Sequence, residues 1–156
     1  MTKTAGLAGL SLIAASVLVS DASATTIAPV RMTSGELSLV APENAALRAS
    51  GPDAWVVRAH GFTMGIVRGV ADLDDSEPRR CYDAEQVEID GRGALLRKTR
   101  ASARADCPEN YVSVYLPALR DGTKAVFVWG QGAYDIDMPV MADIAQSIQF
   151  AHAAAR

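Results

Sequence analysis

Two cysteines bracket a predicted β-hairpin, and this arrangement constrains the fold more than any other feature of the chain. Gln86–Asp90 alternates apolar and polar residues, and Ala94–Arg100 returns after the turn Asp90-Gly91-Arg92-Gly93, whose residues tolerate positive φ. Cys81 and Cys107 lie on either side of this hairpin and are the only two cysteines in the chain. Two cysteines in an exported protein most often form one disulfide. We therefore expect a Cys81–Cys107 disulfide at the base of the hairpin, with the tip left free.

The first 24 residues have the pattern of a secretory signal peptide. Lys3 supplies a positive charge, Ala5–Val19 contains no charged residue, and Ala22-Ser23-Ala24 fits the small-residue site of signal peptidase. The alternative is a membrane anchor, but this apolar run is shorter than the roughly 20 residues that span a bilayer. No cysteine lies near the junction, which excludes lipid attachment. We expect residues 1–24 to be removed, leaving residues 25–156 as one soluble domain, periplasmic or secreted, with no membrane insertion after cleavage.

Short runs with a period of two dominate the rest of the chain and indicate strands. Besides the two hairpin strands, we predict five more strands at Glu36–Val40, Ala54–Ala59, Phe62–Val70, Tyr111–Leu116 and Ala125–Trp129. Gly65, within the third of these, leaves room for close packing or a bulge. Residues 25–34 look extended or loose, residues 43–49 are compatible with one helical turn, and the acidic residues 71–80 form a surface loop.

Met138–Phe150 is the one convincing helix of the sequence. Pro139 suits a first helical turn, Asp137 lies near the positive end of the helix dipole, and apolar residues recur with a period near 3.6. Strands followed by this helix predict an α+β fold, a mostly antiparallel sheet of about 6–7 strands with the C-terminal helix packed across one face. Ala125–Trp129 is apolar on both sides, which favours the centre of the sheet with cover on each face.

The charge distribution is uneven along the chain. Residues 25–78 carry four basic and seven acidic residues, residues 79–104 carry seven and four, and residues 105–156 carry three and six. The formal net charge of −3 argues against general nucleic-acid binding, which requires a strongly basic surface. The middle segment is therefore a basic part of an acidic chain.

The basic residues of the hairpin are candidate contacts to a partner protein with an acidic surface. Arg97, Lys98 and Arg100 lie on the returning strand, and Arg92 lies at the tip. Alternation places Lys98 and Arg100 on one face of that strand and Arg97 on the other. The alternative is a solvated face whose charges pair with acidic neighbours.

Tyr111, Ser113 and Tyr115 share one face of their predicted strand, opposite Val112 and Val114. They form either a second core layer under the helix or an exposed aromatic strip for a partner. We favour the core layer, because tyrosine tolerates a half-buried site with its hydroxyl group in water.

No residue pattern in the sequence indicates catalysis or metal binding. The only histidines are His60, in a predicted tight turn, and His152, near the C-terminus, and no nucleophile or metalloprotease motif is present. Two pairs of carboxylates are close in sequence, Glu85 with Glu88 and Asp135 with Asp137. The first pair points to opposite faces of a strand, and Asp137 has a role where the helix begins. The sequence therefore predicts no catalytic residue, no metal and no cofactor.

The C-terminal part of the chain resembles PsbP-like domains. The resemblance rests on the strand Lys124–Trp129 (KAVFVW), the polar turn after it, and the helix that ends in Ala142–Phe150 (ADIAQSIQF). It implies an antiparallel sheet flanked by helices and a binding role, since that family is largely non-catalytic.

These observations favour an exported, small, non-catalytic binding protein, such as an inhibitor, an immunity-type protein or an accessory protein that recognises another envelope or secreted protein. An alternative is an envelope structural or ligand-carrying protein with a cavity between sheet and helix. A secreted hydrolase that uses carboxylates is the least favoured function.

Overall fold

The computed structural model describes residues 28–70, 79–101 and 105–151. The predicted signal peptide and its cleavage site lie outside these residues, as does nearly all of the predicted acidic loop. Within the described ranges, no helix has the length and apolar character needed to cross a membrane.

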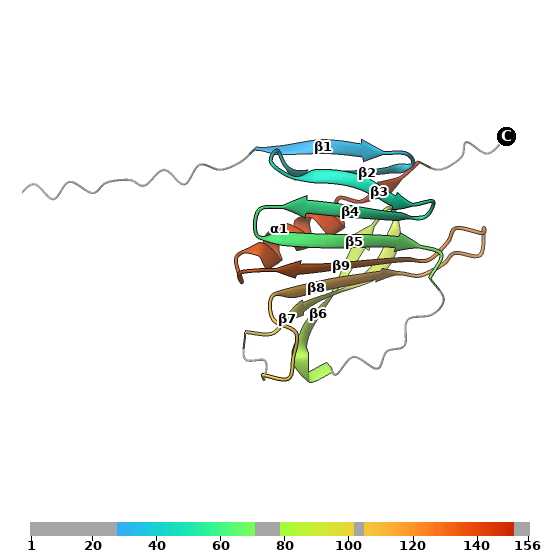
Figure 1. The fold of residues 1–156 in the computed structure, drawn as a ribbon. Helices are drawn as coiled ribbons and strands as arrows, with labels where there is room; N and C mark the ends of the chain where they lie inside the picture. The colour runs from blue at the N-terminus through green and yellow to red at the C-terminus, as the bar shows by residue number, and fades with distance from the viewer. Residues whose placement is uncertain (1–27, 71–78, 102–104, 152–156) are drawn as a thin grey trace, which may run out of the picture.

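The described residues form two antiparallel sheets and one helix (Figure 1). The large sheet has the strand order β3-β4-β5-β9-β8-β7-β6, and the small sheet has the order β1-β2-β10. The helix α1 (Asp137–Gln146) lies behind the large sheet in this view. The strands are β1 (Pro29–Ser34), β2 (Leu37–Pro42), β3 (Ala46–Gly51), β4 (Ala54–Ala59), β5 (Phe62–Arg68), β6 (Tyr82–Ile89), β7 (Arg92–Thr99), β8 (Tyr111–Leu116), β9 (Val126–Gly132) and β10 (Gln149–Phe150).

The predicted α+β class is confirmed, because every strand pair is antiparallel and the C-terminal helix covers one face. The core lies between the large sheet, the small sheet and α1. Alternation in the strands supplies fully buried aliphatic side chains such as Met64 and Val128, and α1 supplies Met141 and Ile144. Burial of such side chains contributes roughly 1.5–3 kcal/mol each and is the main stabilising term of the fold.

Two segments fold differently from the sequence-based expectation in the N-terminal part. Residues 29–34 are not a loose lead-in but form β1, which pairs with β2 along its whole length. Residues 46–51 form β3 rather than part of a helical turn. Pairing with β4 overrides the weak helical preference of this segment, because each strand residue gains a hydrogen-bonding neighbour there.

The helix is shorter than predicted, since it ends at Gln146 and not at Phe150. The Ser147 hydroxyl accepts a hydrogen bond from the Val40 N–H (2.8 Å), so that the chain leaves the helical path at the small sheet. Phe150 then packs edge-on against Trp55, with ring centroids 5.8 Å apart. The last two residues of the predicted helix therefore become β10.

An ionic network holds the small sheet to the large one. The Arg68 guanidinium pairs with Asp53 at 2.7 Å and with Glu36, which precedes β2. Lys124 also pairs with Asp53, at 2.8 Å. Hydrogen bonds from Lys124 and Arg68 lower the pKa of the Asp53 carboxyl, because both favour its charged form. The network fixes the ends of β4 and β5 next to the small sheet.

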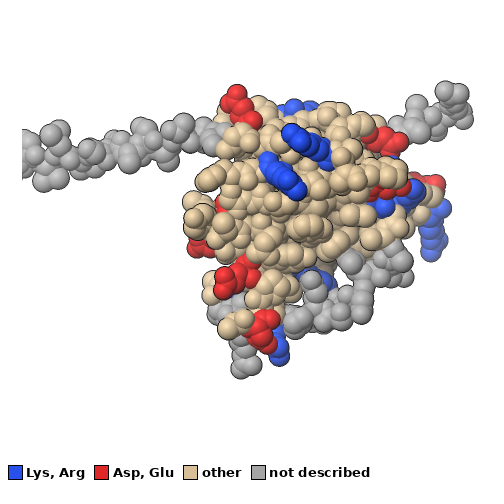
Figure 2. Space-filling model, in the orientation of Figure 1, with Lys and Arg blue, Asp and Glu red and all other residues tan. Residues whose placement is uncertain are grey.

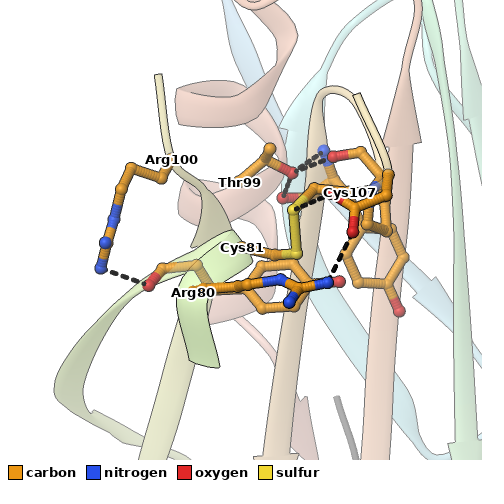
Figure 3. The surroundings of a disulfide bond; sticks show 9 residues. Arg80, Cys81, Thr99, Arg100 and Cys107 are labelled. Carbon is orange, nitrogen blue, oxygen red and sulfur yellow. Dashed lines mark hydrogen bonds and ion pairs between the residues drawn. A yellow bond between two sulfur atoms is a disulfide. The ribbon is translucent and has the colours of Figure 1, made fainter. Parts of the chain in front are cut away.

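The predicted disulfide is present (Figure 3), with Cα atoms 5.4 Å apart and a sequence separation of 26 residues. It joins the short 3-10 helix η1 (Arg79–Cys81) to the segment before β8. Around it, Cys81, Tyr82 and Cys107 form a small buried cluster separate from the main core. The bridge therefore fastens the base of the β6–β7 hairpin, as expected.

Reduction of this disulfide should lower the free energy of unfolding by up to about 3.5 kcal/mol, the chain-entropy value for a loop of 26 residues. The fold should persist, because the main core does not include the bridge. Denaturant titration with and without a reductant measures the change. In a Cys81→Ser/Cys107→Ser variant the reductant should have no further effect, and an unchanged midpoint in the native protein would contradict the prediction.

Candidate binding surface

The large sheet has α1 on one face, and no helix or strand of the described residues crosses its other face (Figure 1). We call this second face the open face. Figure 2 views it directly, and its middle carries almost no charged side chains, while basic side chains stand over its upper strands. The expectation that β9 is covered on both sides is therefore wrong. β9 is the central strand, but α1 is the single described α-helix and covers one side.

Strand register aligns the side chains of the open face in rows. One row crosses all the strands of the large sheet, through Arg48, Val56, Gly65, Trp129, Ser113, Arg97 and Ala84. The row beside it runs through Ala54, Val67, Phe127, Tyr115, Leu95 and Gln86. Directly opposite side chains in such rows lie within contact distance.

The middle of these two rows is apolar and partly exposed. We call it the apolar strip, and it consists of Val56, Val67, Leu95, Tyr115, Phe127 and Trp129. These residues lie on five adjacent strands, from β4 to β7. Hydrogen bonding on both sides of each central strand makes the strip a rigid surface.

The indole of Trp129 lies flat against the backbone of β5 at Gly65. A Cβ atom at Gly65 would lie only 2.4 Å from the indole Nε1 and 2.5 Å from Cε2. The predicted close packing at Gly65 is therefore confirmed, and the contacting group is Trp129. One side of the indole covers the sheet, and the partly exposed remainder belongs to the apolar strip.

A hollow of about 380 Å³ lies at one end of the open face, on β3 and β4. Its lining is formed by Ala46, Arg48, Ala49, Ser50, Val56 and Arg58. The side chains of Arg48 and Arg58 are exposed, and neither forms an ion pair or hydrogen bond with any described residue. Neither arginine was a candidate contact from the sequence. Arg48 lies in a segment with no predicted strand, and Arg58, although in the predicted strand Ala54–Ala59, lies in an acidic part of the chain.

Arg92 is not an exposed contact at the hairpin tip, and this expectation was wrong. The residue is only 4% exposed, and Nη1 donates hydrogen bonds to the carbonyl oxygens of Lys124 (3.0 Å) and Pro117 (3.4 Å). Its Nη2 atom lies 3.5 Å from an Asp90 carboxylate oxygen. Strand alternation explains the burial, since Arg92 points to the same side as the buried Ala94. A partner cannot reach it.

Lys98 and Arg100 are paired with acidic residues of the neighbouring strand. Lys98 Nζ lies 3.5 Å from the Glu85 carboxylate, and Arg100 Nε lies 2.9 Å from that of Asp83. Of the basic hairpin residues, Arg97 alone lies on the open face, in the row of Trp129. Alternation therefore separates the three residues as predicted, and their contact with a partner stays a prediction.

Tyr111, Ser113 and Tyr115 also belong to the open face. The favoured expectation, a second core layer under the helix, is wrong, because α1 packs on the side of Val112 and Val114. Tyr111 and Tyr115 are partly exposed and Ser113 is buried. The arrangement of the two tyrosines thus agrees better with the alternative expectation, an exposed aromatic strip.

The carboxylate pairs show no arrangement for acid–base catalysis. Glu85 and Glu88 point to opposite faces of β6, as expected. Asp135 accepts a hydrogen bond from the Ile136 N–H (2.8 Å), and Asp137 accepts one from the Tyr134 N–H (3.0 Å). Both aspartates therefore stabilise the turn before α1. That turn also exposes two large apolar side chains, Tyr134 at 64% and Ile136 at 73%.

Comparison with known proteins gives little similarity. No family model matches the chain, and no curated protein matches it. One similar solved structure is the solution structure of cyanobacterial PsbP (CyanoP) from Synechocystis sp. PCC 6803, with 10% sequence identity and a TM-score of 0.47 over 85% of this chain and 98% of that chain. Likeness at this level carries no information about function. Membership of the PsbP-like family stays a prediction.

Arg92→Ala should lower the free energy of unfolding by about 3–5 kcal/mol, because it removes the counter-charge of a buried Asp90 carboxylate. Asp90→Asn/Arg92→Met, which removes both charges and keeps the long stem, should recover part of the loss, since asparagine tolerates the φ of 54° at this position. Chemical denaturation measures both. Arg120→Ala, at an exposed loop position, is the control, and equal stability of the two alanine variants would refute the structural role of Arg92.

Gly65→Ala should displace the Trp129 indole and cost about 1–3 kcal/mol of stability, because the new methyl group occupies the space of the ring. Tryptophan fluorescence should shift to the red as the indole becomes more exposed. Gly93→Ala is a matched control on the same face, because a Cβ atom there meets no atom within 4 Å. If both variants keep the native fluorescence and stability, the indole does not depend on Gly65.

Proposed function

We propose that this chain is an exported, non-catalytic binding protein that recognises another protein through the open face. The observation that carries this proposal is the apolar strip, whose partly exposed side chains lie together on five adjacent strands without cover from a described element. Contiguous exposed apolar surface on a protein is a common feature of interaction sites. The presence of Trp129, Tyr115 and Phe127 adds to this, since aromatic residues are enriched in interfaces.

The rigidity of the sheet supports a binding role. The strip is carried by β4, β5, β9, β8 and β7, and each of these strands pairs with a neighbour on both sides. A surface that is already ordered loses little conformational entropy when a partner binds. The rows also contain Gln86 and Arg97, so that polar groups accompany the apolar ones, as in typical interfaces.

The alternative functions receive less support from the described residues. A ligand cavity between sheet and helix requires space where α1 is in direct contact with β9, as Met141 is with Gly130. A hydrolase requires two facing carboxylates, whereas Asp135 and Asp137 are bonded to the turn before α1. Export rests on the signal-peptide pattern and accords with the Cys81–Cys107 disulfide.

Site-specific photo-cross-linking in cells that export the protein tests this proposal. A photo-reactive amino acid at Gln86 lies at the edge of the apolar strip, and the same group at Gln146 lies on α1, behind the sheet. Both glutamines are exposed, so they form a matched pair. We expect one defined protein adduct from position 86 and none from position 146.

A second cross-linking experiment uses a variant with a charged residue within the apolar strip. Leu95→Glu should abolish the adduct from position 86, because it places a carboxylate in an interface that excludes water. Circular dichroism and a thermal melt verify that the variant is folded. Equal adducts from both positions, or an adduct that survives Leu95→Glu, would show that the open face is not the binding surface.

A further inference from the structure

We infer that Arg48 and Arg58 form the anion subsite of the open face, and that its occupant is the carboxylate of an Asp or Glu side chain that lies next to an apolar residue in the partner protein. This inference rests on the proposed function, because it names the chemistry of the partner that the open face binds. It concerns the hollow on β3 and β4, which lies at the end of the row that leads to Trp129.

The register of β3 and β4 places the two arginines side by side on the same face, where both line the hollow. Arg58 is opposite Ala46, and Arg48 is opposite Val56, so the two arginines are diagonal neighbours on the same face. Diagonal neighbours in a sheet have Cα atoms about 7–8 Å apart, which long side chains span. Two planar guanidinium groups at this spacing can both donate hydrogen bonds to one carboxylate.

Within the described part of the chain, neither arginine has a counter-charge, unlike several other basic residues of the protein. Arg68, Lys98, Arg100 and Lys124 each have a carboxylate within 3.5 Å. Arg48 and Arg58 have none among the described residues. Two like charges on adjacent strands repel each other, and a bound anion relieves this repulsion.

The lining of the hollow matches an acidic side chain in size and polarity. Ala46, Ala49 and Val56 supply a small apolar floor, and Ser50 supplies a hydroxyl group beside the two arginines. The methylene groups of an Asp or Glu side chain fit such a floor while the carboxylate reaches the guanidinium groups. Val56 belongs both to this hollow and to the apolar strip. The partner residue next to the acidic one therefore contacts apolar surface, and we expect it to be apolar.

The position of the hollow favours a carboxylate of a partner protein over a free anion. An exposed ion pair in water contributes under about 1 kcal/mol, so two exposed arginines hold a small free carboxylate weakly. A partner that covers the apolar strip also covers Val56, and it excludes water from the adjacent hollow. Charge attraction is stronger in such a less polar environment and increases the association rate.

Nuclear magnetic resonance titration of the ¹⁵N-labelled mature protein with two matched peptides tests the inference. The probes are Gly-Glu-Phe-Glu-Gly and Gly-Gln-Phe-Gln-Gly, both acetylated at the N-terminus and amidated at the C-terminus, so that the glutamate side chains supply the only carboxylates. We expect the glutamate peptide to bind about fivefold more tightly and to shift amide signals of β3 and β4. This preference should shrink between about 20 and about 150 mM NaCl, because salt screens exposed charges.

Variants assign the preference to the two arginines. Arg48→Gln/Arg58→Gln should bind both peptides equally, whereas Arg120→Gln, at an exposed arginine outside the open face, should keep the fivefold preference. The amide spectrum of each variant shows that it is folded. A preference that survives Arg48→Gln/Arg58→Gln, or equal binding of both peptides to the unchanged protein, would overturn the subsite.

The remaining outcomes separate this inference from the proposed function. Equal binding of both peptides with shifts confined to β8 and β9 overturns the subsite and leaves the open face as the binding surface. Sodium acetate is the control for a free carboxylate. If it causes the same amide shifts at the same concentrations as the glutamate peptide, the inference that the subsite binds a carboxylate of a partner protein is overturned. If neither peptide binds, the subsite fails, and cross-linking from Gln86 decides the proposed function independently.

Discussion

The close approach of α1 to the large sheet at Gly130 determines what both faces of the sheet can do. A Cβ atom at Gly130 would lie 2.6 Å from Met141 Sδ and 3.1 Å from Met64 Cγ, so the absence of a side chain at Gly130 leaves the space that Met141 of α1 fills on β9. The helix then covers the core face and completes the burial of Val112, Val128 and Ile144. Because α1 is the one described α-helix and packs on this face, no α-helix of the described residues covers the other face of the sheet.

The two faces of the sheet differ in chemistry as well as in cover. Mainly aliphatic side chains, together with Trp55 and Phe62, fill the core face. The open face carries Phe127, Trp129 and Tyr115, which have large flat surfaces. Aromatic side chains suit a partly exposed position, because tyrosine and tryptophan combine an apolar body with a polar group. Gly65 lets the Trp129 indole lie against the sheet, just as Gly130 lets α1 lie against the opposite face.

The parts of the fold that local residue patterns determine were predictable from the sequence. The hairpin, its disulfide and most of the strands follow from alternation and turn residues within short segments. β3 and the end of α1 were not, because their structure depends on pairing with β4 and on the contact of Phe150 with Trp55. The sequence did contain a signal for the burial of Arg92, since alternation aligns it with Ala94 and Leu96.

The candidate site was less predictable than the fold, because it depends on charges that meet across strands. By residue count, segment 79–104 is basic and segment 25–78 is acidic. In the folded protein, however, Glu85 pairs with Lys98 of β7 and Asp83 pairs with Arg100, just after β7. Arg48 and Arg58, which have no ionic partner among the described residues, stand on β3 and β4 in the acidic segment. Charge counted along the chain is therefore a poor guide to the charge that a partner meets. Strand register decides which cations remain available to an acidic partner.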